Sequence, residues 1–196
     1  MPEVRREQFL KNIRDETQRI QNLVDRLLEL SAIEKRRGLS EIQEVRLDEL
    51  LPEAMASVGP VADARGVRIV VQGAEGCGLG GDRFLLHQAL TNLLQNAIDF
   101  SPSGGTIEVA VTSTNRHHRI SIRDHGPGIP DYALDRVFEK FYSLRRPHSG
   151  KKGTGLGLSF VKEIAEIHRG SAELRNHPDG GAVAILTLPK RAHFSG

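Results

Sequence analysis

The stretch DRFLLHQALTNLLQNAIDFSP, residues 82–102, is typical of one amphipathic helix with polar signals at both ends. Asp82 is a favourable N-cap residue, and Ser101-Pro102 predicts the end because proline disfavours a helical residue before it. Asn92 and Asn96 are four residues apart and therefore share one face of this helix. The apolar residues of the helix are Leu86, Leu90, Leu93, Leu94 and Ala97.

The two amides indicate a binding role for this helix. A largely apolar helix seldom places two asparagines on one face unless they bind something. Amide oxygens suit a hard cation such as Mg²⁺, which keeps waters and substrate phosphates among its ligands. The alternative is that Asn92 and Asn96 only hydrogen-bond to neighbouring backbone.

A second motif, DHGPGI at 124–129, follows a predicted strand. The carboxylate of Asp124 could accept a hydrogen bond from an exocyclic amine such as that of adenine. Gly126 and Gly128 permit unusual backbone angles and let a flat ligand come close. The alternative is an ordinary turn, in which Asp and Gly are common.

A third motif, GTGLGL at 153–158, precedes a predicted helix from about Gly155 to His168. Free backbone N–H groups and the helix dipole at such a junction attract phosphate. The motif matches neither a P-loop nor the dinucleotide fingerprint. Just upstream is a basic loop, which either offsets the charge of a triphosphate or is simply solvated. Its cationic residues are Arg145, Arg146, His148, Lys151 and Lys152.

The order of these motifs resembles the ATP-binding domain of sensor histidine kinases. The N, G1, F and G2 boxes of that family here read TNLLQNAIDF, DHGPGIP, FEKFYSL and GTGLGLSF, and the resemblance spans about residues 45–190. NAIDFSP and GIPDYALDRVFEKFYSL resemble the CreC branch in particular. The resemblance implies an α+β fold shared with gyrase-type and Hsp90-type ATPases. In that fold a mixed, mainly antiparallel sheet is backed by helices, and ATP binds between them under a flexible lid.

The resemblance also implies roles for individual residues. Asn96 should ligate Mg²⁺, Asn92 should assist at the phosphates, and Asp124 should bind the adenine amine. The glycines of the G2 box should frame the phosphates, while the aromatic residues of the F box, among them Phe138, should pack and position the lid. The full set expected to bind ATP is Asn92, Asn96, Asp124, Gly126, Gly128, Ile129, Phe141, Tyr142, Lys151, Lys152, Gly153, Thr154, Gly155, Leu156 and Gly157.

One position departs from the family pattern. Many members carry Lys or Arg three residues after the second Asn, and this chain has Asp99 there. The substitution removes a cation from the region expected to hold the phosphates. We therefore expect the affinity for nucleotide, or its dependence on metal, to differ.

The remaining pattern predicts short strands and helices. A strand at 45–47 leads into a helix capped by Asp48 that runs to about Arg65, and a strand at 67–72 precedes a glycine-rich loop at 73–81. The stretches 106–113 and 118–124 predict a hairpin, and a short helix follows near 131–140. A second hairpin surrounds the turn HPDGG. The order predicts an α/β sandwich of one sheet with helices on one face.

The first segment predicts one long helix over 2–37, with Phe9, Ile13, Ile20 and Val24 on an apolar stripe. The stripe needs cover, from a partner helix or from its own domain. ETQRIQNLVDRLLELSAIE resembles the second helix of the kinase dimerisation and phosphoacceptor hairpin. None of the eight histidines has the acceptor's context, so autophosphorylation in cis is not expected. We expect a truncated hairpin at 1–38, a linker at 39–44 and the ATP-binding domain at 45–192.

The composition of the chain argues against several classes of protein. The 27 Lys+Arg against 25 Asp+Glu give a net charge of +2, which argues against a nucleic-acid binder. The single Cys77 excludes an intrachain disulfide framework. No signal peptide or membrane-spanning stretch is evident, so membrane attachment is expected only through upstream segments. The resemblance implies the cytoplasmic domain of a sensor anchored in the bacterial inner membrane.

The family resemblance also implies partners. They are a response regulator, the protein's own phosphoacceptor helix and, in the intact protein, a second copy in a homodimer. Two alternatives stay open: a serine kinase of the anti-sigma type with the same fold, and a non-catalytic nucleotide-binding module. The N-terminal helix counts against the first, and the intact N, G1 and G2 boxes count against the second.

Overall fold

The computed structural model describes residues 42–148, 150 and 152–190, together with scattered positions between 9 and 39. The chain divides into two compact units, residues 1–35 and 36–196. In the first unit the described residues between 9 and 33 are helical. The exposed large apolar residues among them are Phe9, Leu10, Ile13, Ile20, Val24, Leu27 and Leu28. The rest of the expected helix over 2–37 lies outside the described residues.

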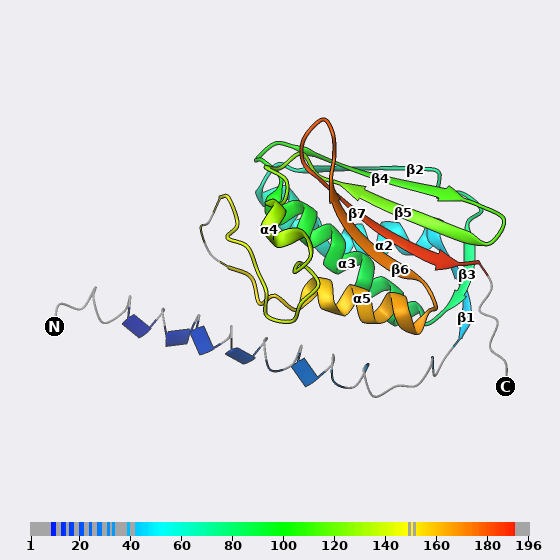
Figure 1. The fold of residues 1–196 in the computed structure, drawn as a ribbon, viewed down its shortest axis with the longest axis horizontal. Coiled ribbons are helices and arrows are strands. Elements are labelled where there is room, and N and C mark those ends of the chain that lie inside the picture. Colours follow the sequence, from blue (N-terminus) through cyan, green and yellow to red (C-terminus); the bar gives the residue numbers. More distant parts are fainter. Residues whose placement is uncertain are drawn as a thin grey trace. The chain divides into compact units, whose positions relative to one another are not determined.

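The second unit is built on a five-stranded sheet with the strand order β2-β4-β5-β7-β6 (Figure 1). The strands are β2 (Arg68–Gln72), β4 (Thr106–Ser113), β5 (His117–Arg123), β6 (Ser171–Asn176) and β7 (Ala182–Pro189). β2 and β4 are parallel, and the other neighbours are antiparallel. The mixed, mainly antiparallel sheet expected from the sequence is confirmed, and so are both hairpins.

Helices α2 (Leu47–Ala64), α3 (Arg83–Phe100) and α5 (Gly157–Ile167) cover one face of this sheet (Figure 1). α3 packs against both α2 and α5. It begins where predicted because the carboxylate of Asp82 accepts a hydrogen bond from the Leu85 N–H at 3.2 Å. At its other end, the guanidinium of Arg65 donates to the carbonyl oxygens of Ile98 and Ser101.

Apolar burial between the helices and the sheet holds α3 in place. Each fully buried Leu or Ile contributes about 1.5–3 kcal/mol. The residues buried there include Leu86, Leu90, Leu94, Ile98, Ile107, Ile120 and Phe160. A separate cluster of Ile129, Ala133, Val137 and Ala182 supports the segments that follow β5. Within the described part of the chain, no helix combines the length and apolar character needed to span a membrane.

A small second sheet corrects the expectation of a loop over 73–81. β3 (Gly78–Gly81) pairs antiparallel with β1 (Gln43–Arg46), and β1 begins two residues before the expected strand. Leu79 lies opposite Val45, and both side chains are buried. Glycine is depleted in strands, so local propensity did not indicate β3, and its partner comes from a distant part of the chain.

The boundaries of three helices also differ from the prediction. Asp48 is not an N-cap: α2 begins at Leu47, and the Asp48 carboxylate accepts hydrogen bonds from Arg46 and from the Gly76 N–H. α4 covers only Asp131–Leu134, and turns replace the rest of the helix expected to residue 140. α5 begins at Gly157, two residues later than predicted.

Candidate functional site

Asn92 and Asn96 lie on the face of α3 that meets the first turn of α5. A Cβ added to Gly157 would lie 3.5 Å from Oδ1 of Asn92 and 4.0 Å from Nδ2 of Asn96. Among the described residues, neither amide has a hydrogen-bond partner. The alternative in which both only bond neighbouring backbone is therefore not supported, and both amides are available to a ligand.

The start of α5 completes this polar surface. Leu156 is the N-cap residue, and no side chain caps the helix there. The hydroxyl of Thr154 accepts a hydrogen bond of 3.4 Å from the Leu156 N–H, which fixes the turn before the helix. An uncapped helix start presents main-chain N–H groups and a partial positive charge, both of which favour an anion.

Asp124 lies directly after β5 and is buried, with 7% of its surface exposed. Its Oδ1 accepts hydrogen bonds from the N–H groups of Gly126 (2.8 Å) and Ala182 (3.3 Å). Burial raises the pKa of this carboxyl, and those two hydrogen bonds oppose the shift. No described residue bonds Oδ2, so this oxygen can accept a hydrogen bond from a ligand.

Residues 124–130, which we call the G1 loop, are fixed by contacts from two other elements. A side chain at Gly126 would collide with the carbonyl of Phe100 at the end of α3. Asn176, the last residue of β6, accepts from the Ile129 N–H at 2.7 Å and donates to the Ile129 carbonyl at 2.8 Å. The loop is therefore held by main-chain contacts and by one distant amide.

The F and G2 boxes meet through their main chains. The Phe141 N–H donates to the Gly155 carbonyl at 2.9 Å, and both residues have positive φ, +66° and +71°. A Cβ at Gly155 would lie 2.7 Å from the Tyr142 nitrogen, so a larger residue does not fit. Tyr142 packs under the guanidinium of Arg136 at 4.4 Å, whereas Phe141 is 57% exposed.

The basic loop is tied to the G2 box and to α3. Ser143 Oγ accepts from the Gly153 N–H at 3.0 Å, and Arg145 pairs with Lys152 in an isolated antiparallel bridge. Nη2 of Arg146 lies 2.7 Å from Oδ2 of Asp99, whose side chain is 8% exposed. Burial raises the pKa of Asp99, although Arg146 and Gln95 act in the opposite direction.

The structure gives Asp99 a partner that the sequence did not indicate. The helix lacks a cation at this position, but the basic loop supplies one and neutralises the carboxylate. A Cβ at Gly153 would lie 3.5 Å from Nη2 of Arg146, so the guanidinium is adjacent to the G2 box. The two charges cancel, so the pair adds no net positive charge, and the effect of Asp99 on nucleotide affinity or metal dependence stays a prediction.

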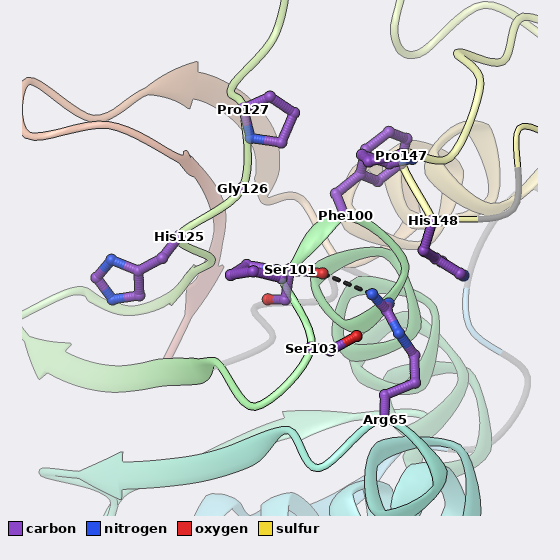
Figure 2. Close-up of a pocket in the computed structure, with 10 residues that line it drawn as sticks. Arg65, Phe100, Ser101, Ser103, His125, Gly126, Pro127, Pro147 and His148 are labelled. Atoms are coloured by element: carbon purple, nitrogen blue, oxygen red, sulfur yellow. Dashed lines mark hydrogen bonds between the residues drawn. The ribbon is translucent and has the colours of Figure 1, made fainter.

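A cavity of about 470 Å³ opens between the G1 loop and the basic loop. His125, Gly126 and Pro127 form one side, and Pro147 and His148 form the other (Figure 2). The end of α3, from Phe100 to Ser103, and Arg65 close the base (Figure 2). The wall made by the basic loop begins one residue after Arg146.

The structure therefore groups the expected residues in three places. Asn92, Asn96 and Gly157 meet at the α3–α5 junction, the expected residues from Asp124 to Ile129 form the G1 loop, and Phe141 and Tyr142 contact Gly155. Lys152 is exposed, and Lys151 lies outside the described residues. Asn176 and Ser143 were not anticipated, because each acts on main chain remote in sequence and no local motif marks it.

The sequence is similar to those of known proteins. Residues 81–192 match the model of the family described as histidine kinase-, DNA gyrase B- and HSP90-like ATPase. The chain is 40% identical to sensor protein CreC of Escherichia coli (strain K12), over 95% of this chain and 38% of that protein. It is 38% identical to sensor protein SphS of Synechococcus elongatus, over 89% of this chain and 45% of that protein. The chain thus spans less than half the length of these curated relatives.

Solved structures of histidine kinases have a similar fold. The catalytic domain of histidine kinase ThkA matches with a TM-score of 0.66 and 27% identity, over 77% of this chain and 99% of that one. ThkA in complex with response regulator protein TrrA matches with a TM-score of 0.77 and 27% identity, over 100% and 54% of the two chains. Because the family model covers more than half of the sequence, the chain belongs to the histidine kinase-, DNA gyrase B- and HSP90-like ATPase family and contains the catalytic domain of a sensor histidine kinase.

Proposed function

We propose that this domain binds Mg·ATP and donates the γ-phosphate to a histidine on a dimerisation helix, from which an aspartate of a response regulator receives it. The observation that carries the proposal is the pair of unpartnered amides, Asn92 and Asn96, facing the uncapped start of α5. The proposal is also supported by the sensor proteins among the relatives and by the solved complex of ThkA with a response regulator.

The adenine site is proposed at Asp124. Its unbonded Oδ2 would accept a hydrogen bond from the exocyclic amine, while Oδ1 stays bound to main-chain N–H groups. Gly126, which has no room for a side chain, and Gly128, with a φ of +75°, leave space for the base beside Ile129. Guanine has no amine at the equivalent edge, so this arrangement favours adenine.

The donor set at α3 fits Mg²⁺. Asn96 is the proposed protein ligand through its amide oxygen, and Asn92 would assist at the phosphates. In the part of the chain that the structure describes, no three His, Cys, Asp or Glu side chains could hold a metal together. Phosphate oxygens and water would therefore complete the shell. When bound, the ion neutralises charge on the phosphates during transfer.

The remaining residues act by positioning. Thr154, Gly155 and Gly157 would offer main-chain N–H groups to the phosphates at the start of α5. Gly153 and Leu156, whose N–H groups donate to Ser143 and Thr154, would shape the turn around them. Phe141 and Tyr142 would order the junction between the F and G2 boxes, and Lys151 and Lys152 would add positive charge. Catalysis would rest on alignment and charge neutralisation, with the nucleophile and its base supplied by the acceptor helix.

The N-terminal segment 1–38 is proposed as the second helix of the dimerisation hairpin, joined by a linker at 39–44 to the ATP-binding domain at 45–192. Its exposed apolar side chains, such as Phe9, Ile13 and Ile20, would be covered by neighbouring helices in a four-helix bundle of the homodimer. The domain would then be the cytoplasmic part of a membrane-anchored sensor.

Calorimetric titration of ATP, with and without Mg²⁺, tests the nucleotide site. We expect binding that Mg²⁺ strengthens and that Asp124→Ala abolishes. Absence of binding to the folded chain would contradict the proposal.

A second experiment tests the transfer step. A separate chain carrying the acceptor helix of a related kinase is added together with labelled ATP. Label on its histidine supports the proposed kinase. Label on serine would support the anti-sigma type, and absence of transfer despite ATP binding would support a non-catalytic module.

A further inference from the structure

The ion pair between Asp99 and Arg146 joins the helix that carries both asparagines to the basic loop. Asp99 is on α3, three residues after Asn96, and Arg146 directly precedes Pro147 and His148, which form one wall of the cavity in Figure 2. We propose that Asp99 is a positioning residue: by holding Arg146 it sets the wall, formed by Pro147 and His148, of the cavity that adjoins the proposed adenine site at Gly126. This inference rests on the proposed function.

The pair is well suited to fix a loop. The Asp99 side chain is 8% exposed and that of Arg146 is 34% exposed, so the carboxylate is shielded from water while the guanidinium is half-buried. Gln95 also donates to the second carboxylate oxygen of Asp99 at 3.2 Å, which holds the carboxylate in one orientation. A buried charge that loses its partner is strongly unfavourable, so the loop is held to α3 at this point.

Two other contacts of the loop lie nearer its ends than this wall does. Ser143 bonds Gly153 of the G2 box, and the Arg145–Lys152 bridge joins the two ends of the loop to each other. The Gly150 N–H donates to the Arg146 carbonyl at 2.9 Å, which closes a turn around Pro147 and His148. Among the described residues, Asp99 makes the side-chain contact that ties this turn to α3, across from the G1 loop.

Adenosine is the informative ligand because it is uncharged. Replacing Asp99 or Arg146 changes the local charge, and with ATP that effect would mix with any displacement of the wall. With adenosine the charge effect is small, and a change in affinity reports the shape of the cavity. Asp99→Asn keeps the volume and the bond from Gln95, and Arg146→Gln removes the cation.

The test is a double-mutant cycle on adenosine affinity, measured by NMR titration of the whole chain. We expect Asp99→Asn and Arg146→Gln each to weaken binding about five- to tenfold, with no further loss in the double variant, as for two residues of one network. Arg146→Lys, which retains a cation, should restore most of the affinity. Arg119→Gln, an equal charge change at an exposed position of β5 outside the cavity lining, should leave adenosine affinity unchanged.

Several outcomes would overturn the inference. Unchanged adenosine affinity in both single variants, additive losses in the double variant, or failure of Arg146→Lys to rescue would each show that the pair does not set the wall. A gain in affinity for Asp99→Asn would show that the pair obstructs the cavity. If the wild-type chain binds neither adenosine nor ATP, the proposed function fails as well. This result differs from the one that overturns only the inference, in which the wild-type chain binds adenosine and the variants bind it equally well.

Discussion

Asn176 holds the main chain of Ile129 through both of its amide atoms, accepting from the N–H at 2.7 Å and donating to the carbonyl at 2.8 Å. Asn176 ends the strand β6, whereas Ile129 lies in the G1 loop, so two remote segments meet here. A Cβ on Gly128 would lie 2.8 Å from the same amide oxygen, which explains why the loop needs glycine beside this contact. The position of the proposed adenine site thus depends on a side chain outside the family motifs.

Removing this amide should loosen the G1 loop. Asn176→Ala is expected to lower the free energy of unfolding by about 1–2 kcal/mol, because two hydrogen bonds to main chain are lost. ATP affinity, measured by calorimetry, should also fall. Asn176→Asp keeps the acceptor and loses the donor, so it should give an intermediate result. Wild-type ATP affinity in Asn176→Ala would show that the contact does not order the site.

Asp124→Asn should weaken ATP binding without lowering the stability of the fold. The asparagine oxygen can still accept from Gly126 and Ala182, which places the NH₂ group where Oδ2 faced the ligand. A donor facing the adenine amine should weaken ATP binding by at least about tenfold, the cost of one hydrogen bond to a charged group.

The stability of the same variant should not fall. Burial raises the pKa of Asp124, which means that the ionised carboxylate opposes folding at pH 7. A neutral side chain of the same size removes this cost, so the free energy of unfolding, measured in urea, should be equal or higher. A marked loss of stability together with normal ATP affinity would contradict both expectations.

The parts of the fold that could be predicted are those encoded locally. The cap at Asp82, the spacing of Asn92 and Asn96 and the glycines of the G2 box are readable because each depends on residues within a few positions. β3 was missed because its glycines acquire strand structure only by pairing with β1. Asn176 and the Asp99–Arg146 pair were missed because their partners are far away in sequence, and only the folded chain brings them together.

Acidification should destabilise the domain through two buried histidines. Burial lowers the pKa of His118 and His168, so the unfolded chain, in which histidine has a pKa of about 6.5, takes up protons first. The free energy of unfolding should therefore fall as the pH drops from about 6.5 toward the lowered pKa values. In the folded chain Nε2 of His168 accepts from the Asp82 N–H at 3.1 Å, a bond that protonation would break.

Urea unfolding at several values between about pH 5 and 7 measures this effect. His118→Gln and His168→Gln should each flatten the dependence relative to wild type. The comparison between variants is needed because Asp99 and Asp124, whose pKa values are raised, act in the opposite direction. Parallel curves for wild type and both variants would assign the acid sensitivity to other groups.

Gly155→Ala should disrupt the junction between the F and G2 boxes, with Gly150→Ala as its matched control. Both glycines have positive φ, +71° and +63°, so each substitution carries the backbone cost of about 1–2 kcal/mol for a left-handed residue. Only at Gly155 does the new methyl group also meet main chain, 2.7 Å from the Tyr142 nitrogen, whereas nothing lies within 4 Å at Gly150. The collision must displace the Phe141–Tyr142 main chain, and with it the hydrogen bond from Phe141 to Gly155. Gly155→Ala should therefore lower the free energy of unfolding, measured in urea, more than Gly150→Ala does. Of the two variants, only Gly155→Ala should weaken ATP binding. Equal losses in the two variants would mean that backbone conformation, and not the close approach of main chain, explains the glycine at 155.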